Sequence, residues 1–233
     1  MNEEVNLTND GYSLHRILKS DIKKDPNKQE DEIIFGCGCF WGAEKCFWKL
    51  PGVVTTSVGY AGGEKNNPTY YEVCSGLTGH SEVVRVIWDK REIDVSDLLK
   101  MFWECHDPTQ KNRQGNDMGT QYRSAIYYKN ENNIKTILAS KEQYQTELSK
   151  KNLGLIETEI KMIDSYFYAE QYHQQYLASA GSRQYCSASP TKVKLGVFTG
   201  SNYKLEDHIW ENFNWEVDKC VLRSDNNPIK NNI

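Results

Sequence analysis

A cysteine lies inside a short run of small and aromatic residues, Gly38–Gly42 (GCFWG). The run follows residues 33–35, whose apolar character predicts a strand, and leads into residues 40–50, whose spacing predicts a helix. A cysteine at a strand-to-helix turn faces backbone N–H groups and the positive end of the helix dipole, which together favour an anion. Cys39 is therefore a candidate nucleophile with a lowered thiol pKa. The simpler alternative is a buried free cysteine beside core aromatics.

A second candidate group is the carboxyl of Glu82, within a predicted strand over residues 80–89. Alternation along that strand places Glu82 on the same face as Val84 and Val86. If this is the core face, burial raises the carboxyl pKa and keeps the group protonated near neutral pH, so that it can donate a proton. A glutamate at the strand end that faces solvent or pairs with Arg85 fits the pattern equally well.

Other polar side chains stand beside predicted loops. Tyr70 follows a loop rich in glycine and asparagine, and Tyr122 follows the long polar loop of residues 107–120. Their hydroxyls could donate to a ligand oxygen, although packing is the simpler explanation for any single tyrosine. Asp117 is most simply a turn residue. Cys186 lies in a segment with a weak secondary-structure signal, from which it could reach a reactive cysteine or remain an incidental surface thiol.

Composition excludes several classes of function. The 233 residues carry a formal charge of −4, and no basic block indicates nucleic-acid binding. No apolar run is long enough to cross a membrane, and the acidic N-terminus has no signal-peptide core. We therefore expect a cytoplasmic protein, most simply a monomer.

The seven cysteines are scattered along the chain and odd in number. In a reducing compartment this argues against a disulfide framework. One residue separates Cys37 from Cys39, whereas zinc-binding pairs usually have two to four intervening residues, and no second matching pair is present. The sequence therefore predicts no metal and no cofactor.

Strand and helix patterns alternate along the chain. Expected strands cover residues 32–35, 53–60, 80–89, 121–128 and 156–162. Expected helices cover residues 40–50, 69–75, 97–106 and 131–150, with a final helix carrying Tyr168, Tyr172, His173 and Tyr176. Since several strands look half-solvated, we expect an α+β two-layer sandwich with a mixed sheet, flanking helices and a ferredoxin-like core.

The chain divides into three predicted parts. Residues 1–30 are polar and read as an N-terminal extension. Residues 31–190 hold the periodic elements and all the candidate groups, so they read as the catalytic domain. Residues 191–233 form a C-terminal tail of uncertain structure.

The motifs, taken in order, resemble those of the peptide-methionine (S)-S-oxide reductases, the A-type methionine sulfoxide reductases. The GCFWG run resembles the catalytic signature of that family. The other matching segments are Gly59–Gly63 (GYAGG), Pro68–Tyr70 (PTY), Gly79–Glu82 (GHSE), His106–Thr109 (HDPT), Gln114–Ser124 and Ala169–Leu177. The resemblance spans residues 33–186 and leaves both chain ends outside.

The resemblance implies a mechanism. The Cys39 thiolate would attack the sulfoxide sulfur, while protonated Glu82 donates to the sulfoxide oxygen. Tyr70 and Tyr122 would be further donors to that oxygen, and Asp117 would support the site by hydrogen bonding. Collapse of the adduct would release methionine and leave a sulfenic acid on Cys39.

The resemblance also implies a substrate, a recycling route and a partner. Phe40 and Trp41 would form an apolar wall for the substrate methyl group, so that only the S epimer fits, free or in oxidised proteins. Cys186 would then form a disulfide with Cys39, and thioredoxin would reduce it. Whether Cys220, inside the tail, joins this relay stays open.

Two other functions are consistent with parts of the pattern. A thiol hydrolase or transferase would use Cys39 with a histidine such as His173, would form an acyl-enzyme and would not need Cys186. No local pattern supports such a triad, and a lone histidine on a helix is more simply structural. An inert binding module would hold methionine in the aromatic pocket without turnover. The joint presence of Cys39, Glu82, Tyr70 and Tyr122 favours the reductase.

Overall fold

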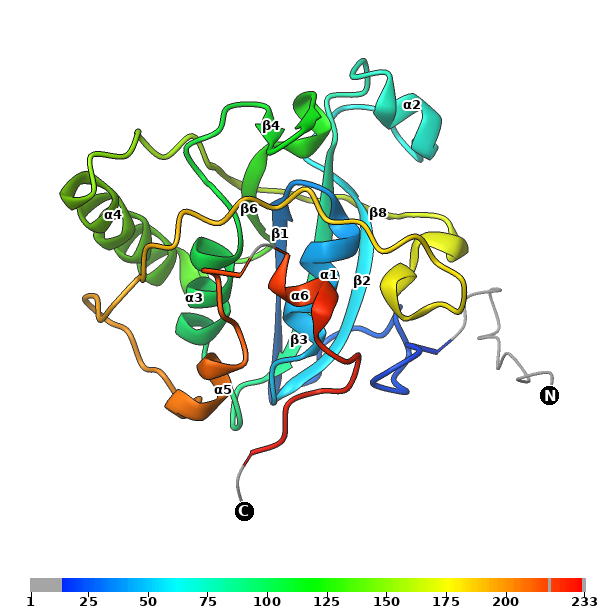
Figure 1. Ribbon diagram of the computed structural model, residues 1–233. Helices are drawn as coiled ribbons and strands as arrows, with labels where there is room; N and C mark the ends of the chain where they lie inside the picture. Colours follow the sequence, from blue (N-terminus) through cyan, green and yellow to red (C-terminus); the bar gives the residue numbers. More distant parts are fainter. Residues whose placement is uncertain (1–13, 218, 232–233) are drawn as a thin grey trace.

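A six-stranded sheet forms the centre of the computed structural model, which describes residues 14–217 and 219–231 (Figure 1). β6 and β7 pair in parallel and every other neighbouring pair is antiparallel, so the sheet is mixed. In spatial order the strands are β7 (Glu159–Met162), β6 (Ser124–Tyr128), β1 (Glu30–Cys37), β3 (Ser81–Asp89), β2 (Val53–Ala61) and β8 (Tyr166–Tyr168).

Helices cover one face of this sheet. α1 (Phe40–Trp48) packs on β2 and β3, and α3 (Val95–Cys105) packs on β1. The other helices are α2 (Tyr70–Cys74), α4 (Ile134–Lys150) beside α3, α5 (Asp207–Glu211) and α6 (Cys220–Arg223) against α1 (Figure 1). The expected α+β class, with a mixed sheet and flanking helices, is confirmed. Within the described ranges no helix is long and apolar enough to cross a membrane.

Local sequence signals explain the ends of these helices. Asp94 Oδ1 accepts from Ser96 N at 2.9 Å, and Asp97 Oδ2 accepts from Asp94 N at 3.1 Å, a reciprocal cap that starts α3. α1 stops before Pro51, and Gly52 then turns the chain with φ of +83°, a conformation in which L side chains are strained.

The main core lies between the sheet and these helices. Phe35 of β1 stacks on Phe47 of α1 at 4.8 Å and on Phe102 of α3 at 5.1 Å. Val84 and Val86 belong to this core, so the face of β3 that also carries Glu82 is the core face. The opposite face of β3 packs in a second, smaller cluster. β3 is therefore buried on both faces and is not one of the half-solvated strands that the sequence pattern predicted.

The expected final helix is wrong. Tyr168 ends β8, and single 3-10 turns follow at Gln171–His173 and Tyr176–Ala178. The amide of Gln174 explains the difference, because it accepts from Val58 N and donates to Val58 O, both at 2.9 Å. Gln175 next to it is left-handed, with φ of +47°. Tertiary hydrogen bonds to β2 thus replace helical ones.

A second expected element begins later than predicted. The strand expected from residue 121 starts only at Ser124, after the 3-10 turn Thr120–Tyr122.

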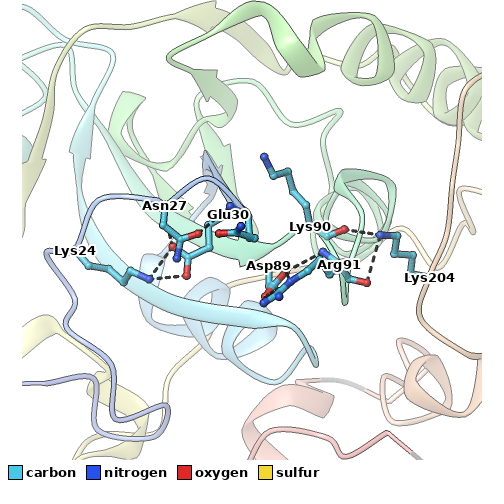
Figure 2. Close-up of polar contacts among 8 residues, drawn as sticks. Lys24, Asn27, Glu30, Asp89, Lys90, Arg91 and Lys204 are labelled. Atoms are coloured by element: carbon cyan, nitrogen blue, oxygen red, sulfur yellow. Dashed lines mark hydrogen bonds and ion pairs between the residues drawn. The ribbon is translucent and has the colours of Figure 1, made fainter.

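Polar contacts gather around the start of β1 and the turn after β3, where the segment before β1 and the C-terminal segment approach (Figure 2). Lys24 Nζ donates to the two carboxylate oxygens of Glu30 at 2.6 and 2.7 Å, where β1 begins. Lys90 N donates to Gln29 O at 2.9 Å, and Lys204 Nζ from the C-terminal segment donates to Lys90 O. The segment before β1 and the C-terminal segment therefore meet at this turn.

The described part of the C-terminal segment packs on the helices. Its residues Val193, Leu195, Phe198, Leu205, Ile209, Phe213, Trp215 and Val221 belong to the main core. Glu104 of α3, only 2% exposed, accepts from Leu195 N at 3.0 Å and from Lys194 Nζ at 2.9 Å. A buried carboxylate thus anchors the start of this segment to α3.

The Glu104→Ala variant tests this anchor. It leaves the buried N–H of Leu195 without an acceptor, so we expect the free energy of unfolding in urea to fall by about 1–3 kcal/mol. Lys194→Met is the matched control, because Lys194 is 60% exposed; its effect should stay within about 0.5 kcal/mol. Equal effects of the two substitutions would show that the exposed ion pair, rather than the buried hydrogen bond, holds the segment.

Candidate active site

Cys39 lies at the start of α1, as the strand-to-helix pattern predicted, and is buried. Burial, followed by the negative charge of nearby Glu82, raises the pKa of the Cys39 thiol well above its ordinary value. The backbone N–H of Trp41 acts in the opposite direction. The expected lowering of this pKa is therefore wrong for the substrate-free site, because complete desolvation outweighs the helix N-terminus.

Glu82 points into the same turn from the start of β3. Phe40 N donates to its Oε2 at 3.1 Å, and the side chain is buried, as strand alternation allowed. Burial raises the pKa of Glu82 to about 8; the charge of Asp117 raises it further, and the Phe40 N–H opposes the rise. The carboxyl therefore keeps its proton at neutral pH, although it lies beside a thiol and at a helix N-terminus.

Two tyrosines and an aspartate surround this pair. Tyr70 begins α2, and Tyr122 ends the 3-10 turn before β6. Burial first, and also the charge of Glu82, raise the pKa of both phenols, so they remain hydrogen-bond donors. Asp117, in the small hairpin β4 (Arg113–Gln114) and β5 (Asp117–Met118), accepts from Tyr185 Oη at 2.6 Å through Oδ1.

The thiol of Cys186 reaches α1 from the C-terminal side. A Cβ atom on Gly42 would lie 2.4 Å from Cys186 Sγ, so the sulfur packs directly on the glycine backbone in the first turn of the helix. A negative charge on Cys186 would also raise the pKa of the Cys39 thiol. Cys220, on α6, lines the same cavity as Cys186.

Aromatic rings form one wall beside Cys39. Phe40 is buried, and Trp41 stacks on Tyr176 with ring centroids 3.9 Å apart. Trp41 Nε1 donates to His173 Nδ1 at 3.1 Å. The His173 ring lies 5.2 Å from that of Phe40 and 4.7 Å from that of Tyr70. The His173 ring is therefore the common contact of residues 40–41 and α2. It belongs to the segment of residues 170–178, called the 170s segment below.

His173 is a site residue that sequence reasoning left as structural. Its Nδ1 accepts from Trp41, so in the neutral ring Nε2 carries the hydrogen. That Nε2 is buried and has no hydrogen-bond partner among the described residues; a Glu170 carboxylate oxygen lies 3.9 Å away. Burial lowers the pKa of His173 to about 4, which keeps the ring neutral. Neither ring nitrogen bonds to Cys39 within the described part of the chain, so the two residues do not form a Cys–His pair.

Glu44 is a second residue that sequence reasoning missed. It is fully buried on α1 and accepts from Gln175 N at 2.8 Å, Gln175 Nε2 at 2.7 Å and Thr56 Oγ1 at 3.0 Å. Burial raises its pKa to about 7. Glu44 thereby fixes the segment that carries His173 and Tyr176, and no spacing in the sequence connects these positions.

The fold thus brings all the predicted site residues to one end of α1. A protonated carboxyl lies beside one thiol, a second thiol packs against the first turn of α1, and two phenols and an aromatic wall surround them. This arrangement can protonate an oxygen atom on a substrate and form a bond between two sulfurs.

Comparison with known proteins identifies the family. The family model of peptide methionine sulfoxide reductase matches residues 31–203. The peptide methionine sulfoxide reductase MsrA of Vibrio vulnificus is 54% identical over 180 residues, covering 77% of this chain and 86% of the relative. That of Azotobacter vinelandii is 57% identical over 164 residues, covering 70% of this chain and 76% of the relative.

Solved structures agree with this. Methionine sulfoxide reductase A of Corynebacterium diphtheriae is 41% identical, with a TM-score of 0.68 over 80% of this chain and 90% of that one. Reduced Mxr1 from Saccharomyces cerevisiae is 34% identical, with a TM-score of 0.64 over 70% of this chain and 92% of that one. The motifs, the fold and these relatives agree: the chain belongs to the peptide methionine sulfoxide reductase family.

Proposed function

We propose that this chain reduces the S epimer of methionine sulfoxide, free and within proteins, with Cys39 as nucleophile and Glu82 as acid. Family membership gives the reaction, the reduction of methionine sulfoxide to methionine. The observation that carries the assignment of roles is the hydrogen bond from Phe40 N to Glu82, which holds a buried carboxyl at the turn that begins with Cys39.

The first step consumes the sulfoxide. Protonated Glu82 donates its proton to the sulfoxide oxygen, and the hydroxyls of Tyr70 and Tyr122 donate hydrogen bonds to it. The Cys39 sulfur attacks the substrate sulfur, and its thiol proton passes to Glu82, which restores the acid. The adduct then collapses: the hydroxyl moves from the substrate sulfur to the Cys39 sulfur, which breaks the S–O bond of the substrate, and the bond between the two sulfurs breaks as methionine leaves. The products are methionine and a Cys39 sulfenic acid.

Two chemically different walls of the site select the S epimer of the substrate. Phe40 and Trp41 offer an apolar surface to the substrate methyl group, whereas the acid and the phenols receive the oxygen. Exchanging methyl and oxygen would bury the oxygen against rings and leave the donors unpaired, which is costly. Asp117 supports the site through Tyr185, and the Nε2–H of His173 is a further donor for the substrate.

The second step returns the enzyme to its reduced state. The Cys186 thiol attacks the sulfenic sulfur of Cys39, the hydroxyl leaves as water with the thiol proton, and a disulfide forms. Thioredoxin then reduces this disulfide by thiol–disulfide exchange. The close packing of Cys186 Sγ on Gly42 supports Cys186, rather than Cys220, as the resolving residue. No cofactor is needed.

The same proposal extends to architecture and location. Residues 31–190 form the catalytic domain, residues 1–30 an N-terminal extension and residues 191–233 a C-terminal tail, whose described part packs on α1 and α3. The order β6-β1-β3-β2, with α1 and α3 as the crossovers, supports a ferredoxin-like core. We place the protein in the cytoplasm, since its seven cysteines are free and a reducing compartment would keep them so. We further propose that it is a monomer.

The pH dependence of the first turnover tests Glu82 as the acid. Its pKa is raised to about 8, so the proton is present below that pH and lost above it. We expect methionine formation by the wild type to fall above about pH 8. Glu82→Gln should be slower by roughly 10²–10⁴-fold and should lack the alkaline fall, because an amide has no proton to lose. Single-turnover quench-flow from pH 5 to 10, without an external reductant, measures both rates. An unchanged alkaline limb in Glu82→Gln would remove Glu82 from this role.

Gly42→Ala tests the resolving step. The new Cβ would overlap Cys186 Sγ and displace it from the first turn of α1. We expect the first methionine to form at nearly the wild-type rate and the disulfide to form roughly 10²-fold more slowly, the usual effect of a misplacement of about 1 Å. Quenched reactions alkylated and followed by mass spectrometry separate the two rates, and Cys186→Ser is the control without a disulfide. Wild-type disulfide rates in Gly42→Ala would argue for another resolving cysteine.

A further inference from the structure

A turn at residues 14–21, before the range matched by the family model, packs against α1 and β2. Leu14 and Asp21 pair as an isolated antiparallel bridge that closes the turn. His15 is fully buried, and its ring meets that of Trp48 on α1 edge-on, with the ring centroids 5.9 Å apart. The turn therefore places one imidazole in the packing between α1 and β2.

Hydrogen bonds fix the tautomer of His15. Its Nδ1 accepts from Ile17 N at 3.2 Å and from Leu18 N at 3.0 Å, so this nitrogen carries no hydrogen. Burial, followed by the positive charge of Lys19, lowers the pKa of His15 to about 3, so the ring is neutral. The hydrogen of the neutral ring is then on Nε2, which lies 2.8 Å from Thr56 Oγ1 and donates to it.

The hydrogen bonds continue from Thr56 toward the active site. Because Thr56 Oγ1 accepts from His15, its own hydrogen is available to Glu44 Oε1, 3.0 Å away. Glu44 in turn accepts from Gln175 N at 2.8 Å and from Gln175 Nε2 at 2.7 Å. Arg16 N, next to His15, donates to Gln175 Oε1 at 3.3 Å. His15, Thr56, Glu44 and Gln175 thus form a continuous buried path, called the His15 network below.

Gln175 lies between two side chains of the aromatic wall. Its backbone is left-handed, with φ of +47°, a conformation that is unfavourable for most residues and that the bonds to Glu44 maintain here. His173, two residues earlier, accepts from Trp41 Nε1. Tyr176, the next residue, stacks on the same indole with ring centroids 3.9 Å apart. A change in the backbone at Gln175 would therefore move both contacts of Trp41.

We propose that His15 is a positioning residue for the first step of the reaction. Its bond to Thr56 directs the hydroxyl toward Glu44, and that carboxyl sets the backbone that carries both partners of Trp41. His15 acts through these residues rather than on the substrate. The inference rests on the proposed reduction of methionine sulfoxide, because the position of the indole matters only if it receives the substrate methyl group.

The second step, disulfide formation, should not depend on His15. Cys186 packs on Gly42, whereas the His15 network meets α1 at Glu44. These two positions of α1 are two residues apart, so they face different sides of the helix. Damage to the whole fold would impair both steps, whereas loss of the His15 network impairs only the step that uses the aromatic wall.

Two substitutions of His15 separate the two roles of its ring. His15→Asn keeps an acceptor for the N–H groups of residues 17 and 18, as Nδ1 does, but is too short to reach Thr56. His15→Gln keeps a donor at the position of Nε2. The wall contacts the methyl group before and during the reaction, so a displaced wall weakens binding and leaves the maximal rate unchanged.

First turnovers with methionine S-sulfoxide, without an external reductant, measure the effect. We expect His15→Asn to raise the half-saturating concentration about 10-fold, the usual effect of losing one methyl contact, and His15→Gln to restore most of the wild-type value. Thr56→Val interrupts the same network without touching the N-terminal turn and should give the same rise. The double variant should show no further rise, because both changes remove one interaction.

The controls separate positioning from general damage. At saturating sulfoxide, His15→Asn should form methionine and the disulfide at wild-type rates. His208→Asn is the matched substitution, placed on α5, and should leave all values unchanged. Near-ultraviolet circular dichroism confirms that each variant is folded.

Three results would overturn the proposal. These are an unchanged half-saturating concentration in folded His15→Asn and Thr56→Val, an equal rise in His15→Gln and His15→Asn, or equal slowing of both steps at saturating sulfoxide. Absence of methionine from the wild type is a different outcome, which would remove the proposed function itself and this inference with it.

Discussion

The hydrogen bond from Phe40 N to Glu82 is the interaction on which the site depends. A helix N-terminus favours a negative charge, yet burial of Glu82 between the sheet and α1 disfavours one. The effect of burial is larger than that of the helix N-terminus, so the pKa of Glu82 rises to about 8 and the carboxyl keeps its proton at neutral pH. The same burial raises the pKa of Cys39, so the resting site holds a thiol and an acid rather than two anions. In the proposed mechanism, charge develops only when a sulfoxide oxygen accepts the proton.

This geometry depends on the position of α1, and hydrogen bonds at both ends of the helix fix that position. Glu44 fixes the 170s segment and, through it, the ring stack on Trp41. At the other end of α1, three side chains bind backbone carbonyls of the C-terminal segment. Lys45 Nζ donates to Ser224 O, Trp48 Nε1 to Asn226 O, and Lys49 Nζ to Asp225 O and Asn227 O. These bonds bring two buried lysines into contact with oxygen acceptors, as buried ammonium groups require.

Periodicity in the sequence was sufficient for the elements that depend on local pattern. It predicted β1, β2, β3, β6 and β7, the helices α1 to α4 and the position of Cys39 at the start of α1, but it expected a loop where the β4–β5 hairpin lies and left the side of Glu82 open. It failed where tertiary contacts override local preference: the side chains of Gln174 and Gln175 bond to β2 and to Glu44, so the expected helix is absent. No spacing rule connects Trp41 with His173, or Glu44 with Gln175. The prediction of a lowered pKa for the Cys39 thiol was wrong for a related reason, since burial is a property of the folded chain.

The most direct test of the central claim is mass spectrometry of the reduced protein after one addition of methionine S-sulfoxide, with no reductant present. Wild type, Cys39→Ser and Cys186→Ser would be compared. The account predicts methionine together with a Cys39–Cys186 disulfide in the wild type, methionine without that disulfide in Cys186→Ser, and no methionine in Cys39→Ser. A disulfide between Cys39 and Cys220 would contradict the assignment of the resolving residue. Absence of methionine from the wild type, or its formation by Cys39→Ser, would contradict the assignment of Cys39 as the nucleophile.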